Sequence, residues 1–242
     1  DYGFDFYEDI LEWLQTNYPS VVVHGFSSVE ISYIAKTSKL SFEEVFKRLQ
    51  AKGLTSIPGA GAEMLSDRVR GIISPKKQSS KEWIDIHRAA HKVGIKSSST
   101  MMYDTVETDE EIINHLLQLR NLQDETSGFR SFITWSFQGN NTKLLEEYPS
   151  IKKTSSNKYL RILAISRLFL DNIPNIQSSW VTQGSYIGQM ALLFGANDLG
   201  STMMEENVVS ATGVSNTMNQ DEMKILIKDI GEIPAKRDTY YN

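Results

Sequence analysis

The residues best suited to chemistry in this sequence lie in short polar segments that follow apolar runs. The most distinctive of these segments is Ser56–Glu63, with the sequence Ser-Ile-Pro-Gly-Ala-Gly-Ala-Glu. Its two glycines allow a tight turn and a close approach of the backbone to a ligand, and the helix start expected at Met64–Arg70 offers free N–H groups to an anion. The third glycine of a dinucleotide fingerprint is absent, so a cofactor loop and a structural turn are both open interpretations.

Two further patterns each allow a functional and a structural interpretation. His87 and His91 are spaced i, i+4 on an expected helix and could offer two ligands to a metal. A helix after a barrel strand lies outside the barrel, so buried core histidines are the favoured interpretation and no metal site is predicted. Trp135 and Phe137 could stack on an aromatic ligand, although filling of the barrel interior is the default for bulky residues on such a strand.

The segment Ile176–Gly184 is unusually polar for a strand that is covered on both faces. Buried polar atoms need hydrogen-bond partners, so its inward groups indicate a ligand inside the fold. Asp198 and the pair Glu205-Glu206 follow in the last polar segment. A carboxylate there could perform acid–base chemistry, although the pair could equally favour the N-terminus of an adjoining helix.

Six apolar or β-branched runs, each leading into an amphipathic helical pattern, predict an α/β fold of parallel βα units. The loops after the strands carry the active site in such folds. A closed barrel has eight strands, so the sequence predicts a partial (β/α) barrel whose first two strands are missing from it. The six runs are Val21–Phe26, Leu54–Pro58, Ile95–Tyr103, Arg130–Phe137, Ile176–Thr182 and Asp198–Met203.

The pattern between the runs predicts helices and a simple domain division. Ser41 followed by Glu44 forms a capping box, and Thr108 is expected to cap a helix that runs to about Gln123. Residues 1–213 are expected to form the partial barrel, and residues 214–242 a C-terminal helix and tail that pack on it. The other helices are expected at Phe4–Thr16, Val29–Lys36, Ser41–Lys52, Ser80–Val93 and Gln220–Ile230.

Composition excludes several classes of function. The net charge of −5 and the pI of about 5.5 argue against a nucleic-acid partner, which needs a basic face. No apolar run approaches the roughly 18 residues of a membrane-spanning helix, so no membrane partner is expected. The absence of cysteine excludes disulfides, thiolate nucleophiles and cysteine metal ligands within these 242 residues.

Several stretches together resemble the radical S-adenosylmethionine (SAM) enzymes of the futalosine route to menaquinone. Two segments, Ser178–Gly184 and Gly200–Val209, resemble the cyclase branch of these enzymes. In the first segment, the aminofutalosine synthase branch typically has a tyrosine before the tryptophan that corresponds to Trp180 and a methionine after the valine that corresponds to Val181. The deazaflavin-cofactor synthase shares much of the same sequence. The resemblance runs from about Asp5 to Gly213 and includes Ser56–Glu63, Thr100–Met102, Leu122–Thr126 and Leu170–Asn172.

The resemblance implies a radical SAM barrel of the TIM type with SAM and a [4Fe–4S] cluster as cofactors. In the cyclase branch, a 5′-deoxyadenosyl radical removes hydrogen from the ribose of dehypoxanthine futalosine. The sugar radical then adds to the aromatic ring, and loss of an electron and a proton gives the spirocyclic product. The cofactor performs the radical chemistry, and the protein binds and orients the reactants. A cytoplasmic location and a reductant such as flavodoxin or ferredoxin are implied as well.

The sequence departs from the family in two places. The Cys-x-x-x-Cys-x-x-Cys loop is absent, so this chain alone is expected to hold no cluster and to be inactive. Asp104 stands where family members usually carry glycine, so the tip of that strand is expected to be altered. The alternatives are aminofutalosine synthase and a cluster-less barrel that binds a nucleoside-like ligand; a metal-dependent hydrolase using His24, Glu63 and Asp198 is the weakest.

The resemblance also implies a set of SAM-binding residues. Glu63 is expected to accept hydrogen bonds from a ribose diol or from the SAM ammonium group. Arg70 or Lys77 is expected to pair with the SAM carboxylate, for which arginine has bidentate geometry. Thr100 and Tyr103 complete the expected cofactor set.

A second set of residues is expected to serve the substrate. Asp198 or Glu206 is expected to accept the proton that is lost when the ring rearomatises. These catalytic assignments follow from residue type and from position after the last strand. The expected lining of the substrate cavity is His24, Ser27, Trp135, Gln138, Trp180, Thr182 and Gln183.

Overall fold

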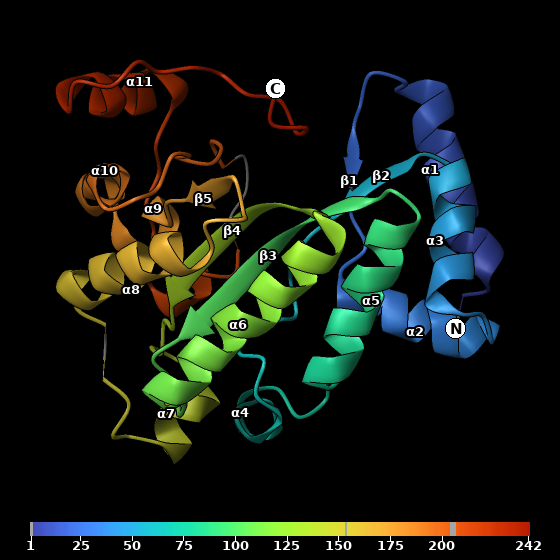
Figure 1. The fold of residues 1–242 in the computed structure, drawn as a ribbon, viewed down its shortest axis with the longest axis horizontal. Helices are drawn as coiled ribbons and strands as arrows, with labels where there is room; N and C mark the ends of the chain where they lie inside the picture. Colours follow the sequence, from blue (N-terminus) through green and yellow to red (C-terminus); the bar gives the residue numbers. More distant parts are fainter. Residues whose placement is uncertain (1, 153, 204–206) are drawn as a thin grey trace.

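The fold is built on one parallel sheet. The computed structural model describes residues 2–152, 154–203 and 207–242. Its strands lie side by side in chain order, and helices cover one face of the sheet (Figure 1). This arrangement is a sector of a (β/α) barrel, as the sequence predicts. The strands are β1 (Val23–His24), β2 (Leu54–Ile57), β3 (Lys96–Tyr103), β4 (Phe129–Ser136) and β5 (Asn175–Gln177).

The helices follow the capping signals of the sequence. The expected capping box at Ser41 with Glu44 is present, and the expected cap Thr108 forms a further box with Glu111. Each supplies partners to the free N–H groups of a first helical turn. The helices are α1 (Phe4–Asn17), α2 (Ser28–Ser38), α3 (Phe42–Ala51), α4 (Asp67–Ile73), α5 (Ser80–Lys92), α6 (Asp109–Thr126), α7 (Lys143–Glu147), α8 (Ser156–Phe169), α9 (Trp180–Gln183), α10 (Ser185–Leu193) and α11 (Gln220–Asp229), with a 3₁₀ turn η1 (Ser210–Thr212).

The two long strands, β3 and β4, begin and end within one residue of the predicted runs. The last two predicted runs differ from the structure. The fifth strand ends at Gln177, and the chain then turns into α9. The turn forms because the Ser179 carbonyl accepts hydrogen bonds from the N–H groups of Thr182 and Gln183, at 3.2 and 3.1 Å. The sixth run contributes one parallel bridge, between Gln177 and Asp198, within the described residues.

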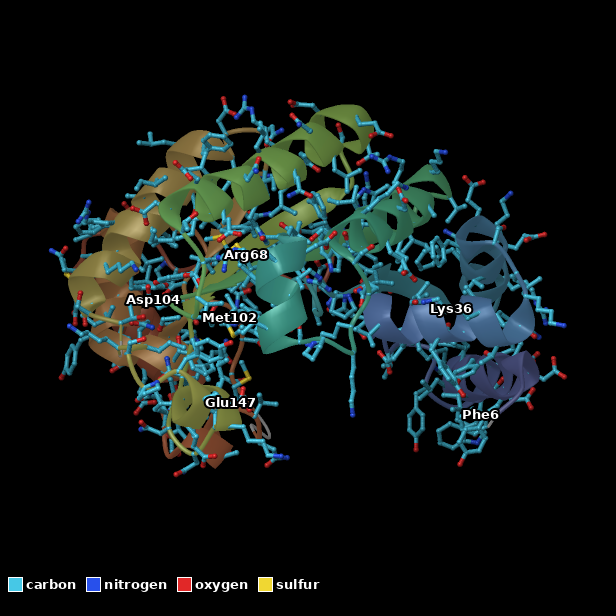
Figure 2. All side chains as sticks on the ribbon, turned by 90° about the horizontal axis from the view of Figure 1, so that it is seen from below. Phe6, Lys36, Arg68, Met102, Asp104 and Glu147 are labelled. Atoms are coloured by element: carbon cyan, nitrogen blue, oxygen red, sulfur yellow. The ribbon has the colours of Figure 1, made fainter. Side chains whose placement is uncertain are left out.

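The two faces of the sheet differ in character. On β3, Met101 and Tyr103 belong to the apolar core between the sheet and the helices, so Thr100 and Met102 face the other way. Figure 2 shows the helices as an arc around the sheet, with Met102 inside the arc. Paired residues of neighbouring strands share a face, so the inner face carries His24, Ser56, Ser98, Thr100, Met102, Ser131, Ile133, Trp135 and Gln177.

The C-terminal segment returns to the sheet. Met218 and Met223 pack with Trp180 in a small core that joins α11 to α9. The chain then runs from α11 toward β1 (Figure 1), and Arg237 donates two hydrogen bonds to Asp198 Oδ2, at 3.0 and 2.8 Å. The division of the chain at residue 213 stays a prediction. Among the described residues, no helix has both the length and the apolar character needed to cross a bilayer.

The histidine pair on α5 lies in the core. His87 Nδ1 and His91 Nε2 lie 3.0 and 2.8 Å from the Ser97 hydroxyl, and His87 stacks on Trp83 with ring centroids 3.8 Å apart. His115 of α6 is also buried and accepts a hydrogen bond from the Leu65 N–H group. These contacts support the core interpretation of the pair.

The buried histidines predict a loss of stability in mild acid. Burial lowers the pKa of His91 and His115 to about 3, and that of His87 well below its usual value. In the unfolded chain these groups titrate near 6.5, so below that pH the unfolded state takes up protons that the folded state excludes. We expect the unfolding free energy to fall by about 1.4 kcal/mol per pH unit for each histidine between pH 6.5 and 4.

Urea unfolding at pH 7.5, 6 and 5 measures this effect. Replacing His91 with Gln removes one of the titrating groups, so the variant should lose less stability over this range than the wild type. Equal pH dependence in the two proteins would show that His91 is not held neutral by the fold.

Candidate active site

The loop between β2 and α4 is docked along β3. The Gly59 N–H donates to Ser98 Oγ at 2.9 Å, and Thr100 Oγ1 donates to the Gly59 carbonyl at 2.8 Å. Further along, the Met102 N–H donates to the Glu63 carbonyl at 2.7 Å. These bonds continue the pairing of β2 with β3 beyond Ile57, so they fix where Glu63 stands at the carboxyl end of the sheet.

The two glycines of this loop are required by packing. A Cβ atom on Gly59 would stand 2.7 Å from the Ser99 Cα atom, closer than real contacts allow. Gly61 has a φ of +86°, and a Cβ atom there would stand 3.0 Å from Ser28 Oγ. The close approach that the sequence indicates is thus between the loop and its own protein.

Arg70 secures the same loop from the other side. It is buried, its Nε and Nη2 atoms donate to the Gln78 carbonyl at 2.8 and 2.6 Å, and Nη1 donates to the Ala62 carbonyl. These three bonds use the guanidinium group on backbone oxygens, and the expected pairing of Arg70 or Lys77 with a SAM carboxylate stays a prediction. Arg70 is a positioning residue, because it clamps the segment that carries Glu63.

Glu63 and Lys77 form an ion pair at the rim of the sheet. Lys77 Nζ lies 2.5 Å from Glu63 Oε1, and the glutamate side chain retains about 16% of its exposure. Glu63 has a φ of +44°, and two more non-glycine residues with positive φ, Phe26 and Asp104, follow β1 and β3. Such backbone strain clusters at functional sites, and here it marks the ends of three successive strands.

Asp104 joins two loops at this rim. Its carboxylate accepts hydrogen bonds from Thr154 Oγ1 and Lys158 Nζ, so it ties the end of β3 to the start of α8. Its φ of +65° is the left-handed conformation that glycine adopts without strain. Beside it lies a cavity of about 430 Å³, lined by polar residues that include Thr105, Glu107, Lys152, Thr154 and Lys158.

Three expected substrate residues form one hydrogen-bonded cluster, in which Gln138 and Gln183 share the Ser136 hydroxyl and Thr182 contacts Gln183. Gln138 Nε2 and Gln183 Nε2 lie 3.1 and 2.8 Å from Ser136 Oγ, and Gln183 Nε2 lies 3.2 Å from Thr182 Oγ1. Thr182 Oγ1 also lies 2.8 Å from Ser179 Oγ. Sequence reasoning missed Ser136 and Ser179, although both lie in the polar segments that it identified.

Other expected site residues have structural positions. Trp180 is 1% exposed in the core with α11, because the turn into α9 rotates it away from the sheet. Tyr103 is fully buried in the core beneath the helices, since strand alternation places it on the outer face. Both side chains belong to apolar cores, and their expected contacts with substrate and cofactor stay predictions. Ser27 caps α2 and donates through its N–H and hydroxyl groups to Glu30, at 2.7 and 2.8 Å.

Of the two expected proton acceptors, Asp198 and Glu206, the structure describes Asp198. Asp198 is salt-bridged to Arg237, and its other oxygen accepts the Gly200 N–H at 2.7 Å. With about 8% of its side chain exposed, this carboxylate is bound to the C-terminal segment, and its expected catalytic role stays a prediction. Glu206 lies outside the described residues.

His24 and Trp135 remain as inner-face candidates. His24 is exposed at the end of β1, and its Nδ1 atom lies 2.8 Å from Ser56 Oγ. The protein around the ring and the charge of Arg130 lower the pKa of His24. Trp135 pairs with Met102 on the same face and is partly buried.

The parallel sheet with its docked loop defines a radical SAM type of barrel. A solved structure, that of methylornithine synthase, matches with a TM-score of 0.59 and 15% identity over 86% of this chain and 63% of that chain, which supports the fold. Residues 1–119 match the model of the radical SAM superfamily, and residues 126–242 match the CofH/MqnC C-terminal region. The chain belongs to the radical SAM superfamily, in the group with the CofH/MqnC C-terminal region.

The curated relatives bear two different names. The cyclic dehypoxanthine futalosine synthases of Streptomyces coelicolor and Halalkalibacterium halodurans are 43% and 44% identical over the whole of this chain. The chain spans 59% and 64% of their lengths. The 5-amino-6-(D-ribitylamino)uracil–L-tyrosine 4-hydroxyphenyl transferase of Archaeoglobus fulgidus is 40% identical over the whole chain, which spans 71% of that relative.

The docking of the loop on β3 predicts unequal effects of two similar substitutions. Thr100→Val removes the hydroxyl that satisfies the Gly59 carbonyl and should lower the unfolding free energy by about 1 kcal/mol. Thr134→Val is the matched control, because the buried Thr134 hydroxyl has no partner among the described residues, and it should cost nothing. Urea unfolding compares them; an equal cost for both would contradict the docking role of Thr100.

Proposed function

We propose that this chain forms the SAM- and substrate-binding part of a radical SAM enzyme that converts dehypoxanthine futalosine to cyclic dehypoxanthine futalosine in menaquinone biosynthesis. The observation that carries the proposal is the 43% and 44% identity, over the whole chain, to two relatives named for that synthase. The polar inner face and the carboxylate at its rim support it, because a nucleoside-like substrate needs many hydrogen-bond partners.

SAM fits the residues at the end of β2. The Glu63 carboxylate lies at the rim, at the end of a loop fixed by β3 and Arg70, where it can accept hydrogen bonds from a ribose diol or an ammonium group. Lys77, its present partner, is the cation nearest to this position for the SAM carboxylate. Bound SAM supplies the radical chemistry of the superfamily, and these residues orient it.

A [4Fe–4S] cluster does not fit these residues. Cysteine thiolates are the usual ligands of such a cluster, and none of the 242 residues is a cysteine. We therefore assign only binding and positioning roles to this chain and expect it to be inactive by itself. A reductant such as flavodoxin or ferredoxin and a cytoplasmic location belong to the same proposal.

The substrate is proposed to lie along the inner face of the sheet. At the carboxyl end of β4, apart from the inner-face positions, Gln138 and Gln183 contact the Ser136 hydroxyl and Thr182 contacts Gln183; these amide and hydroxyl groups are proposed to bind sugar hydroxyls of the substrate. Trp135 offers a ring face for stacking on the aromatic part of the substrate. Glu206 is the proposed proton acceptor.

A second candidate is the hydroxyphenyl transferase reaction. Relatives with that name are 40–42% identical to this chain, close to the 43–44% of the synthases. The segments Ser178–Gly184 and Gly200–Val209, which resemble the cyclase branch, favour the first candidate. Aminofutalosine synthase and a cluster-less nucleoside-binding barrel are the remaining alternatives.

Turnover by the complete encoded polypeptide separates these candidates. After anaerobic reconstitution with iron and sulfide, we expect it to consume dehypoxanthine futalosine in the presence of SAM and a reductant. It should leave 5-amino-6-(D-ribitylamino)uracil with L-tyrosine unchanged, as followed by mass spectrometry. Conversion of the uracil and tyrosine pair instead would replace the proposal by the transferase, and turnover by these 242 residues alone would refute their proposed inactivity.

Glu63 is predicted to contribute to SAM affinity. Glu63→Gln keeps the shape of the side chain and removes its charge, so calorimetric titration with SAM should show about tenfold weaker binding, or 1.4 kcal/mol. Glu110→Gln, on the exposed first turn of α6, is the matched control and should bind SAM as the wild type does. Unchanged affinity in a correctly folded Glu63→Gln protein would remove Glu63 from the site.

A further inference from the structure

The inner face of the sheet carries a histidine–serine pair. His24 and Ser56 are paired residues of β1 and β2, and the His24 Nδ1 atom lies 2.8 Å from Ser56 Oγ. Ile57, the next residue on β2, belongs to the apolar core on the outer face, so Ser56 points inward. Ser56 is 1% exposed, whereas His24 is open to the space inside the sheet.

The burial of Ser56 determines where the proton of the pair lies. Within the described residues, His24 Nδ1 is the one side-chain partner of the Ser56 hydroxyl. If Nδ1 carried a proton and donated it, the buried serine proton would have no acceptor, which costs about 1–3 kcal/mol. The satisfied arrangement is donation from the Ser56 hydroxyl to Nδ1, which leaves the proton of the neutral ring on Nε2.

The surroundings of His24 favour a neutral ring facing a negative group. Its Nε2 atom has no partner among the described residues, and the one ionic group whose charge shifts its pKa is Arg130, which lowers it. Arg130 donates to the Thr239 carbonyl at 3.3 Å and lies over the Tyr240 ring at 5.0 Å. The nearby Asp238 carboxylate already accepts hydrogen bonds from the N–H groups of Tyr240 and Asn242.

We propose that Ser56 holds His24 in the tautomer protonated on Nε2, and that His24 then donates a hydrogen bond to an anionic oxygen, such as a carboxylate, of a ligand inside the sheet. Ser56 is thereby a positioning residue. An N–H donor together with the positive potential of Arg130 complements negative charge. The part of this inference that concerns the ligand (the ligand half) rests on the proposed function, in which a small molecule lies along the inner face. The part that concerns the tautomer of His24 (the tautomer half) does not depend on the proposed function.

The tautomer can be observed directly by nuclear magnetic resonance. Long-range ¹H–¹⁵N correlations of the four histidines, with His24 assigned through His24→Gln, should show a protonated Nε2 and an unprotonated Nδ1 at neutral pH. Ser56→Ala should give a mixture of tautomers, and Ser56→Thr should restore the single one. Ser131→Ala, another inner-face serine, is the matched control and should leave the His24 signals unchanged.

A proton on Nδ1 in the wild type would overturn the tautomer assignment. So would an unchanged single tautomer in Ser56→Ala, because Ser56 would then have no positioning role. Both measurements use the folded chain and require no enzymatic turnover. Failure of the proposed enzymatic activity would therefore not affect the tautomer assignment.

The ligand half is tested with two probes of the same shape. Sodium benzoate should shift the His24 Nε2 signal in a saturable way, and neutral benzamide should not. Arg130→Gln should weaken the benzoate effect by about tenfold. Equal responses to both probes, or no response to millimolar benzoate, would overturn the assignment of an anionic oxygen, whatever substrate the complete enzyme turns over.

Discussion

The backbone of Gly59 lies against β3 so closely that a methyl group there would stand 2.7 Å from the Ser99 Cα atom. The rest of the candidate site depends on this contact. It allows Ser98 and Thr100 to bind both polar groups of Gly59, and it brings the Glu63 carbonyl to the Met102 N–H. Because the loop is fixed to a central strand, its one accessible carboxylate is held at a defined place on the rim.

A second constraint is the alternation of side chains along the strands. The outer face of β3 carries Met101 and Tyr103 into the apolar core, and the inner face carries Ser98 and Thr100. Ser98 and Thr100 on the inner face are bound to the docked loop, and His24 and Ser56 are bound to each other. An inner surface of this kind orients a polar ligand, while the apolar core on the other side keeps the strands in place.

The C-terminal segment determines which carboxylates remain for chemistry. Arg237 binds the carboxylate that directly follows the last bridge of the sheet, so Asp198 holds the segment in place. This ion pair is costly to break from one side, since loss of Arg237 would leave the Asp198 carboxylate as a buried charge with one backbone N–H as its remaining partner. The proposed chemistry therefore relies on Glu63 at the rim, on His24 on the inner face, and on neutral donors such as Gln138 and Gln183 at the carboxyl end of β4.

The sequence by itself determined the partial barrel, β3 and β4, the capping box at Ser41, the cap at Thr108, and the family, because each depends on neighbouring residues or on motifs. It also selected Gln138, Thr182 and Gln183 as candidates, which the structure brings together, and Glu63, whose role stays a prediction. Only the tertiary structure decided the contacts of Arg70, Trp180 and Asp198. Their partners lie on other elements; Asp198 and Arg237, for example, are 39 residues apart. Local pattern reports which side chains are polar, whereas packing decides which of them are already bound.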